Sequence, residues 1–580
     1  MSRANNRAQH IFPTSEAFKM IRKLLALSMS LTLILSGCGQ GIVSTPPGNG
    51  NANTTPPPTP PTPTTASAVI KHVVVIFGEN ISFDFYYGTY PNALNLPGET
   101  KFTAAANTPV PNNYVTNPGL LTANPNLNSA NGAGATNPFR LAPAQALTAD
   151  QDHGYTDEQS AFHGGKMDLF PASVGNPDTP TVATSTGAST IATTKGLTMG
   201  YYDGNSVTAM WNYAQHYALN DHSFGTNFGP STPGAVNLIS GQTNGVVNTV
   251  NPGGAVVADG NGGLTLISDA DPTGDICSST TSSVSMSGKN VGDLLNAKGI
   301  TWGWFEGGFD LTVTNPNGTT GCKRSTVSAI SGTQADYSAH HQPFQYYAST
   351  INPNHNRPTP GVAIGAADAA GANHEYDIHD FTDALKAGNM ASVSFLKAQR
   401  YQDAHAGNSD PIDEGQFVAS IVNSIEQSQF WSSTAIILAY DDSDGWYDHL
   451  TNFVNGSATT ADTLHGAGVC ISATAATVAL PGLTGTNPAQ GRCGYGPRLP
   501  LMVISPWAKK NYIDSTVTDQ SSVLRFIEDT FLSGQRIGAG SFDSVAGPLT
   551  NMFDFSNGAV MPNPSVVVLN PTTGVVTSGN

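Results

Sequence analysis

Four short and nearly continuous apolar runs constrain the fold of this chain more than any other feature. They are VVVIF at 73–77, VSFL at 393–396, AIILA at 435–439 and LMVI at 501–504. A strand with one face in water alternates apolar and polar residues, whereas a strand covered on both faces of a parallel sheet is apolar throughout. These runs therefore predict the buried strands of a parallel sheet.

Segments with helical periodicity lie between these runs. Apolar residues recur with the spacing of a helix face over 206–218, 413–429 and 520–532, and Asp519 or Ser521 is suited to cap the last helix. Strands that alternate with helices predict an α/β fold with three α/β/α layers around a mostly parallel sheet. The stretch 240–290 is rich in Gly, Ser, Thr and Asn and predicts a loop-rich insertion.

The N-terminus carries targeting signals. Residues 1–37 contain a short basic region and an apolar stretch too short to span a bilayer, as in a signal peptide, and Met20 is an alternative start. Cys38 follows Leu-Ser-Gly as in a bacterial lipobox, which predicts lipidation and a place in the cell envelope. A plain secretion signal is the alternative. Residues 38–66 then form a Pro/Thr-rich tether.

The other cysteines are even in number, which in an exported chain predicts two disulfides. Three pairings are possible, and the most local one joins Cys277 to Cys322 and Cys470 to Cys493.

The charge pattern excludes one class of partner. The formal net charge is −17, only 11% of the residues are charged, and the sequence contains no basic stripe. Such a chain repels nucleic acid, so no nucleic-acid partner is expected. Phosphate groups would have to be captured locally, by a metal ion and histidines.

Polar oxygen ligands follow two of the apolar runs, where the carboxyl ends of parallel strands place ligand sites. Glu79 and Asn80 follow the first run, and Asp441 and Asp442 follow the third, with Asp444 close behind. Such groups suit one divalent cation, although oxygen and imidazole ligands do not identify the metal. A helix cap at Asn80 or Ser82 and a structural calcium loop at 441–448 are the alternatives.

A hydroxyl in a Gly/Pro-framed turn is the candidate nucleophile. Ser231 lies in GPSTPG before a modest apolar run, which predicts a serine at a helix start, beside free N–H groups that suit a phosphoryl oxygen. An ordinary helix cap is the alternative. Four histidines in loops could ligate metal, bind phosphate oxygens or protonate a leaving group, namely His153, His340, His341 and His405.

Several long motifs together resemble the bacterial acid phosphatase and phospholipase C family of phosphoesterases. They include IKHVVVIFGENISFDFYYGTYPNA from 70, the segment around NFGPSTPGAVNL, HHQPFQYY, VSFLKAQRYQDAHAG and TAIILAYDDSDGWYDH, in order over most of 69–535. The resemblance implies an alkaline-phosphatase-like fold for a catalytic domain at 67–560, followed by a tail at 561–580. Phospholipase relatives often have Glu where this chain has Asp442 and Thr where it has Ser231, so the acid phosphatase branch is the more similar one.

The resemblance also assigns roles to residues. Glu79, Asn80 and Asp442, with Asp441 as a further candidate, would hold the metal, and Ser231 would be the nucleophile. The catalytic set would further contain His153, His340, His341, His405 and Asp441. Substrate would be bound by Thr232, His153, His340 and His341.

The sequence thus predicts an exported acid phosphatase that works through a phosphoseryl intermediate. The alternatives are a phospholipase C that cleaves phospholipid diesters, and a non-enzymatic, lipid-anchored calcium-binding domain. The expected partners are small phosphate esters or phospholipid, and a membrane through the N-terminal lipid. The sequence leaves the oligomeric state open.

Overall fold

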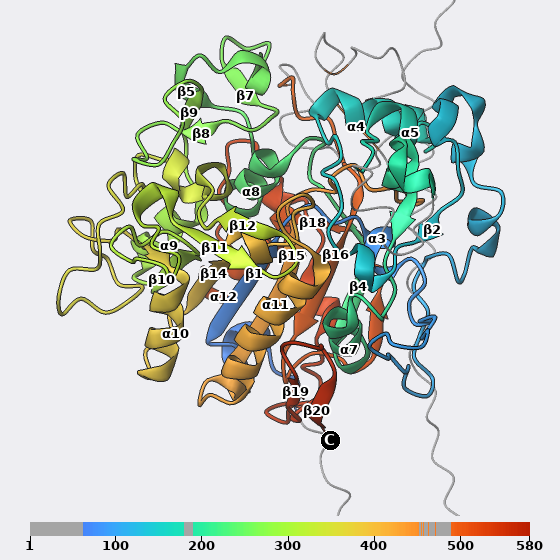
Figure 1. Ribbon diagram of the computed structural model, residues 1–580. Coiled ribbons are helices and arrows are strands. Elements are labelled where there is room, and N and C mark those ends of the chain that lie inside the picture. The colour runs from blue at the N-terminus through green and yellow to red at the C-terminus, as the bar shows by residue number, and fades with distance from the viewer. Residues whose placement is uncertain are drawn as a thin grey trace, which may run out of the picture. The chain divides into compact units, whose positions relative to one another are not determined.

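A nine-stranded sheet forms the centre of the computed structural model (Figure 1), which describes residues 62–178, 190–451, 454, 456, 462, 470 and 489–579. Its strand order is β13 (Glu375–Asp377), β10 (Trp302–Glu306), β14 (Val393–Lys397), β1 (His72–Gly78), β15 (Thr434–Tyr440), β16 (Arg498–Ile504), β4 (Ala218–Phe224) and β17 (Tyr512–Asp514), with β18 (Thr518–Asp519) also paired to β4.

The four apolar runs all lie in this sheet, in β1, β14, β15 and β16. The residues of β14, β15 and β16 are buried throughout, and in β1 only His72 is partly exposed. Two groups of helices provide the cover. In one, α7 (Thr208–His216) packs on α11 (Pro411–Glu426), and in the other, α8 (Ser231–Ser240), α9 (Val291–Lys298) and α12 (Gln520–Phe531) pack on one another. The predicted α/β class with a mostly parallel sheet is therefore confirmed.

One strand runs against the prediction. β16, which contains the LMVI run, is antiparallel to both β15 and β4, whereas β13, β10, β14, β1 and β15 all run parallel to one another. A continuous apolar run reports burial on both faces but not direction, so the sequence could not reveal this reversal. The first residue of β16, Arg498, consequently lies at the edge where the parallel strands end.

The predicted helices are present with slightly different bounds: α7 spans Thr208–His216, α11 spans Pro411–Glu426 and α12 spans Gln520–Phe531. Asp519 rather than Ser521 caps α12, because its side chain accepts a hydrogen bond from the backbone N–H of Ser521. Figure 1 shows α7 and α11 in front of the sheet. The other main helices are α4 (Tyr155–Phe162), α8 (Ser231–Ser240), α9 (Val291–Lys298) and α10 (Ile378–Lys386).

The predicted insertion contains short strands rather than loops alone. A three-stranded sheet joins β5 (Val246–Val250), β9 (Ser283–Met286) and β8 (Asp271–Pro272), and a hairpin joins β6 (Val256–Ala258) to β7 (Leu264–Leu266). Strands this short with Gly-rich turns leave no apolar run in the sequence to mark them.

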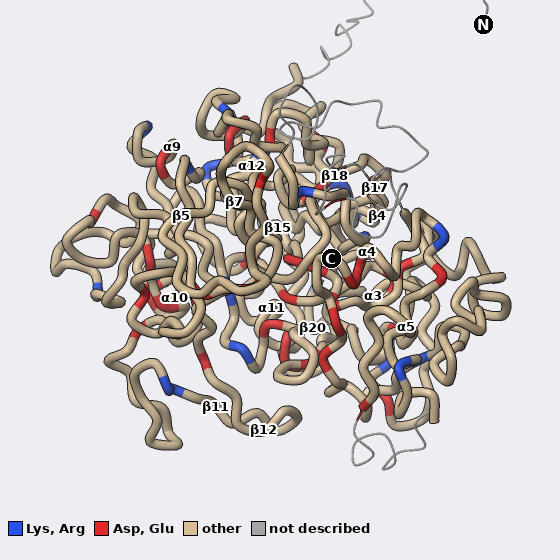
Figure 2. Tube along the Cα trace, turned by 90° about the horizontal axis from the view of Figure 1, so that it is seen from above, with Lys and Arg blue, Asp and Glu red and all other residues tan. Residues whose placement is uncertain are grey.

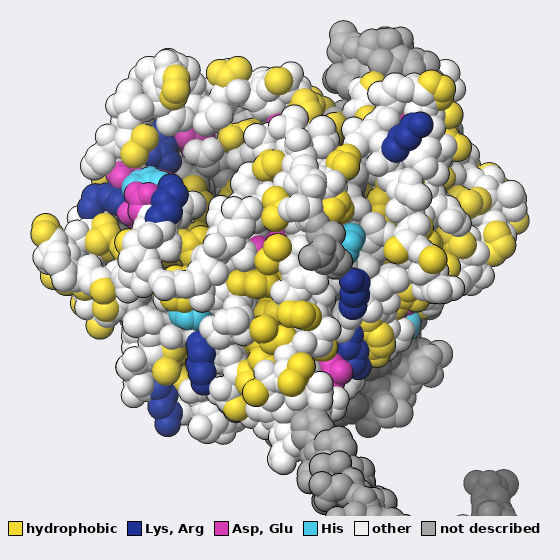
Figure 3. All heavy atoms as spheres, turned by 90° about the horizontal axis from the view of Figure 1, so that it is seen from below, with side chains coloured by type: hydrophobic (Ala, Val, Ile, Leu, Met, Phe, Trp, Pro, Cys, Tyr) yellow, Lys and Arg dark blue, Asp and Glu magenta, His cyan; other side chains and the backbone are white. Residues whose placement is uncertain are grey.

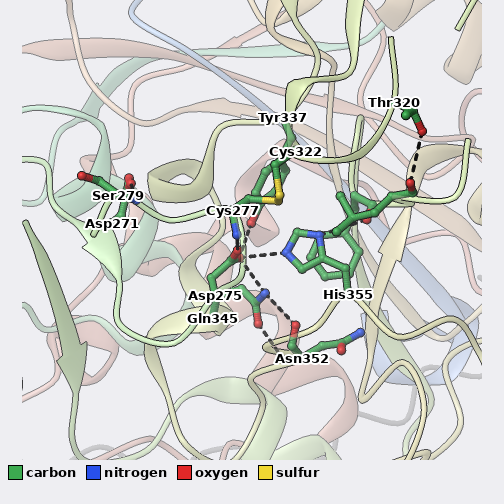
Figure 4. The surroundings of a disulfide bond; sticks show 12 residues. Asp271, Asp275, Cys277, Ser279, Thr320, Cys322, Tyr337, Gln345, Asn352 and His355 are labelled. Atoms are coloured by element: carbon green, nitrogen blue, oxygen red, sulfur yellow. Dashed lines mark hydrogen bonds and ion pairs between the residues drawn. A yellow bond between two sulfur atoms is a disulfide. The ribbon is translucent and has the colours of Figure 1, made fainter. Parts of the chain in front are cut away.

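Both expected disulfides are formed, Cys277–Cys322 and Cys470–Cys493. The first lies beside a buried polar group in which Asp275 accepts hydrogen bonds from Tyr337, Gln345 and His355 (Figure 4). This disulfide ties the insertion to the segment that follows β10.

The C-terminal segment ends in a hairpin of β19 (Val567–Leu569) and β20 (Val576–Gly579). The backbone N–H of Val567 donates to Glu426 at 3.0 Å, at the end of α11. The hairpin thus packs on the same face as α7 and α11.

The surface agrees with the low charge content. Figure 2 shows Lys and Arg scattered along the trace without a basic stripe in the described part of the chain, and Figure 3 shows mostly uncharged side chains on the lower face. Within the described ranges, no helix is long and apolar enough to cross a bilayer. The signal peptide, Cys38 and most of the tether lie outside those ranges and stay predictions.

Candidate active site

Strand register brings the two predicted acidic segments together. β1 and β15 are parallel and in register from His72 with Thr434 to Gly78 with Tyr440. The next residues on the two strands, Glu79 and Asp441, therefore leave the same edge of the sheet side by side. Glu79 is completely buried, and Asp441 is nearly so.

Ser231 meets these segments as the first residue of α8. Its Oγ lies 2.9 Å from Oε2 of Glu79, 3.2 Å from Oδ2 of Asp442 and 3.5 Å from Oδ1 of Asn80. All four side chains are buried, with at most 3% exposure. Side chains as far apart in the sequence as Glu79 and Asp442 thus converge on the hydroxyl oxygen of Ser231.

This arrangement fits a cation. A serine hydroxyl has one hydrogen, so it can donate to only one of the three oxygens around it. The other two oxygens would face a lone pair of the Ser231 oxygen at a buried site, where like charges repel each other. A divalent cation bound between these oxygens would remove the repulsion. Burial raises the pKa of Glu79 and the pKa of Asp442 well above their usual values, so negative charge on these two carboxyl groups is costly at this site.

Asp441 supports the backbone of the residues around Ser231. Its Oδ1 accepts the backbone N–H of Asn80 at 2.9 Å and that of Asp442 at 2.7 Å, and its Oδ2 is buried without a hydrogen-bond partner. The side chain therefore holds the backbone of two ligand candidates in place. Asn80 needs this support, because its φ of 63° lies in the left-handed region.

The four predicted histidines form a row. The ring of His341 lies 4.4 Å from that of His340 and 6.4 Å from that of His405, which lies 6.3 Å from the ring of His153. Nδ1 of His341 lies 3.4 Å from Oε1 of Glu79, which joins the row to the cluster around Ser231.

Two histidines of this row, His153 and His341, differ in their surroundings. Burial lowers the pKa of His153, but the carboxylates of Asp442 and Asp444 outweigh it and raise this pKa well above its usual value. Burial and the neighbouring His340 lower the pKa of His341 well below the usual value. Opposite pKa shifts of this kind favour a protonated imidazolium, which can act as an acid, at His153 and a neutral imidazole at His341.

Thr232 forms hydrogen bonds to an aspartate outside the oxygen cluster around Ser231. Its backbone N–H and its hydroxyl both donate to Oδ1 of Asp269, at 2.9 and 2.8 Å. Its hydroxyl therefore points away from the oxygen cluster around Ser231, and its predicted role in substrate binding requires these donors to be released.

Two charged residues at the site were missed by sequence reasoning. Lys397, the last residue of β14, is 1% exposed and forms an ion pair with Glu79, and Asp269 anchors Thr232. Asp444, which the sequence placed beside the acidic pair, lies 3.2 Å from Nδ1 of His153. A lysine that ends a buried apolar strand was a signal available in the sequence, because a buried ammonium group requires a partner.

The acidic loop after β15 does not form one calcium site. Asp442 faces Ser231, Asp444 faces His153, and Asp448 forms an ion pair with Arg498 at the start of β16. Arg498 also pairs with Asp84 at 2.9 Å. Because these carboxylates turn to different partners, they do not converge on one ligand position within the loop. Asp448 instead lies with Asp84 and His449, and Asp444 with Asp150 and His153, in groups close enough to share a metal ion.

Comparison with known proteins gives a consistent result. A sequence profile described as the Phosphoesterase family matches residues 70–532. The chain is 23% identical to the non-hemolytic phospholipase C of Pseudomonas aeruginosa over 514 residues, which cover 88% of this chain and 60% of that protein. It is 22% identical to phospholipase C A of Mycobacterium tuberculosis over 495 residues, or 84% of this chain and 78% of the relative. The chain thus spans only about three fifths of the Pseudomonas protein.

Solved structures show a more distant similarity. An alkaline phosphatase superfamily protein from Vibrio parahaemolyticus is 10% identical and matches 56% of this chain and 60% of its own, with a TM-score of 0.25. Murine ectonucleotide pyrophosphatase/phosphodiesterase 5 is 9% identical and matches 60% of this chain and 95% of its own, with a TM-score of 0.28. These scores are too low to carry an argument about the geometry of the site.

Proposed function

Because this chain belongs to the phosphoesterase family, we propose that it hydrolyses phosphate monoesters as an acid phosphatase, with Ser231 as the nucleophile. One observation carries the proposal: the hydroxyl oxygen of Ser231 lies within 3.5 Å of oxygens from Glu79, Asn80 and Asp442. A structural serine at a helix start has no need of two buried carboxylates.

The chain's own groups support attack by this oxygen. Ser231 is the first residue of the ten-residue helix α8, whose N-terminal dipole favours negative charge on the oxygen and on the phosphoryl group. Glu79 or Asp442 can accept the hydroxyl hydrogen, since both carboxylates lie within hydrogen-bond distance. Transfer would leave a phosphoseryl residue, which water then hydrolyses.

The histidine row supplies proton transfer and phosphate binding. Nδ1 of His153 faces the backbone carbonyl of Gln151 at 2.9 Å and Asp444 at 3.2 Å, so Nε2 is the atom that can meet a leaving group. His340 and His341 would hold phosphoryl oxygens.

A divalent metal ion held by Glu79, Asn80, Asp442 and Ser231 would lower the pKa of the serine hydroxyl and neutralise charge on the phosphoryl group. Asp441 supports this set through the backbone N–H groups of Asn80 and Asp442. The ligand types leave the metal's identity open.

The test is turnover of p-nitrophenyl phosphate by the wild type and by Ser231→Ala, with several divalent metals added. We expect the variant to lose at least about a thousandfold in kcat, as for other catalytic nucleophiles. Thr232 should not replace Ser231, because its hydroxyl donates to Asp269. Turnover near that of the wild type in Ser231→Ala would refute the assignment.

A phospholipase C is the second candidate. Both relatives described above are named phospholipase C. An apolar cavity also lies beside the turn that carries Ser231, and its wall includes Phe162, Met167, Phe170, Phe228 and Leu450. Rates on p-nitrophenyl phosphate and on phosphatidylcholine separate the two: the phosphatase proposal requires the monoester to be the better substrate.

A further inference from the structure

A buried carboxylate outside the predicted site connects its two main segments. Glu158 lies in the first turn of α4 and is 3% exposed. Its Oε2 accepts the backbone N–H of Gly229 at 2.8 Å, and its Oε1 accepts the hydroxyl of Ser443 at 2.7 Å. Among the described residues, no Lys, Arg or His forms an ion pair with it, so these two donors offset part of the cost of its burial.

The two donors lie next to the reacting groups. Gly229 precedes Ser231 by two residues, and its φ of 113° is a conformation that favours glycine. Ser443 directly follows Asp442 in the loop after β15. A single carboxylate therefore joins the turn that presents the nucleophile to the loop that presents an acidic metal-ligand candidate.

The helix that carries Glu158 also follows a third group of the site. His153 lies just before Gly154, the N-cap of α4, in the loop that leads into the helix and five residues before Glu158. A Cβ atom added at Gly229 would lie 3.6 Å from the Cβ of Tyr155, so this turn faces the start of α4 closely. Through Glu158, α4 thus contacts the segments of Ser231 and Asp442, and the loop of His153 leads into it.

We propose that Glu158 is a positioning residue, which sets the distance between Ser231 and Asp442 through its two hydrogen bonds. This proposal rests on the proposed function, since it concerns the geometry of that reaction. Glu158 itself does not contact Ser231 in this structure. Its effect is exerted through Gly229 and Ser443, and a misplacement of about 1 Å at a reacting atom can cost about a hundredfold in rate.

The hydrogen-bond pattern makes glutamine the informative replacement. In Glu158→Gln the amide oxygen can accept from the Gly229 N–H, while the amide nitrogen donates to the Ser443 hydroxyl oxygen. Glu158→Ala loses both bonds, and Ser443→Ala loses one. A positioning role therefore predicts the activity order wild type, Glu158→Gln, Ser443→Ala, Glu158→Ala.

The experiment measures kcat and KM for p-nitrophenyl phosphate, together with the melting temperature, for the full chain and these variants. We expect Glu158→Ala to lose about 10- to 100-fold in kcat with KM changed less than about threefold, and Glu158→Gln to recover to within about threefold of the wild type. The matched control is Glu426→Ala, which removes a buried carboxylate with two hydrogen bonds at the far end of α11. It should lower the melting temperature and leave kcat unchanged.

Two results would overturn the proposal: a wild-type kcat in Glu158→Ala, or a kcat in Glu158→Gln as low as in Glu158→Ala. If Glu158→Ala does not fold, Glu158→Gln and Ser443→Ala still decide, because equal kcat losses in both contradict the predicted order. Ser231→Ala is measured alongside. Activity in that variant would refute the proposed function, whereas an inactive Ser231→Ala beside a fully active Glu158→Ala would refute only the role of Glu158.

Discussion

At the scale of single residues, the site is a buried hydroxyl among more oxygen acceptors than its hydrogen can serve. The sequence identified Glu79, Asn80, Ser231 and Asp442 through motifs at strand ends and in a Gly/Pro turn. It could not supply their distances, because side chains some 360 positions apart meet only through the register of β1 and β15 and the start of α8. Lys397 had a signal in the sequence, at the end of an apolar run, but its partner Glu79 is visible only in three dimensions.

Lys397 provides the first residue-scale prediction. Replacement by Met leaves the buried carboxylate of Glu79 without its cation, and removing one partner of a buried pair costs about 3 to 5 kcal/mol. Urea unfolding of the metal-free protein measures this loss. Added divalent metal should restore part of it, since a bound cation replaces the missing charge.

Lys386→Met is the matched control for this prediction. Lys386 is 77% exposed and faces Asp383 at 3.9 Å, so its loss should change the free energy of unfolding little. Equal stability losses in the two variants would contradict a special role for the buried pair.

At the scale of elements, the sequence was informative wherever burial dictates residue type. The apolar runs located β1, β14, β15 and β16, and helical spacing located α7, α11 and α12, because these elements lie in the core. The direction of β16 and the short strands of the insertion were not predictable, since neither changes the apolar pattern. The reversal of β16 matters for the site, because it places Arg498 against Asp84 and Asp448.

The cap of α12 provides a prediction at this scale. The sequence left Asp519 and Ser521 as alternatives, and the structure has Asp519 accepting the Ser521 N–H at 2.7 Å. Asp519→Ala should therefore lower the free energy of unfolding by about 1 kcal/mol, the usual loss for a helix cap. Ser521→Ala keeps that backbone bond and should cost less. Chemical denaturation of both variants checks the order, and the reverse order would contradict it.

At the scale of the whole molecule, buried carboxyl groups make stability depend on pH. Burial raises the pKa of Glu426 to about 7 from its usual 4.5, while Tyr217 and the Val567 N–H donate to it. The folded state then binds more protons than the unfolded state between these two values. The contribution of Glu426 to the free energy of unfolding is present below pH 4.5 and is lost as the pH rises towards about 7.

Glu426→Gln tests this pH dependence. One group contributes a slope of at most about 1.4 kcal/mol per pH unit, so the wild-type curve should fall more steeply than the variant curve within this window. The comparison requires the unfolding free energies of both proteins at pH values from about 4 to about 8, a range that contains both pKa values of Glu426. Parallel curves would contradict the raised pKa.

The proposed mechanism depends on the oxygen of Ser231 as the nucleophile, and trapping the phosphorylated protein tests this assignment most directly. The enzyme is quenched in acid during turnover of p-nitrophenyl phosphate, digested and analysed by mass spectrometry. We predict one added phosphoryl group, on Ser231, which is absent from Ser231→Ala and from samples quenched before substrate is added. Phosphate on another residue, or rapid turnover by Ser231→Ala, would contradict the assignment.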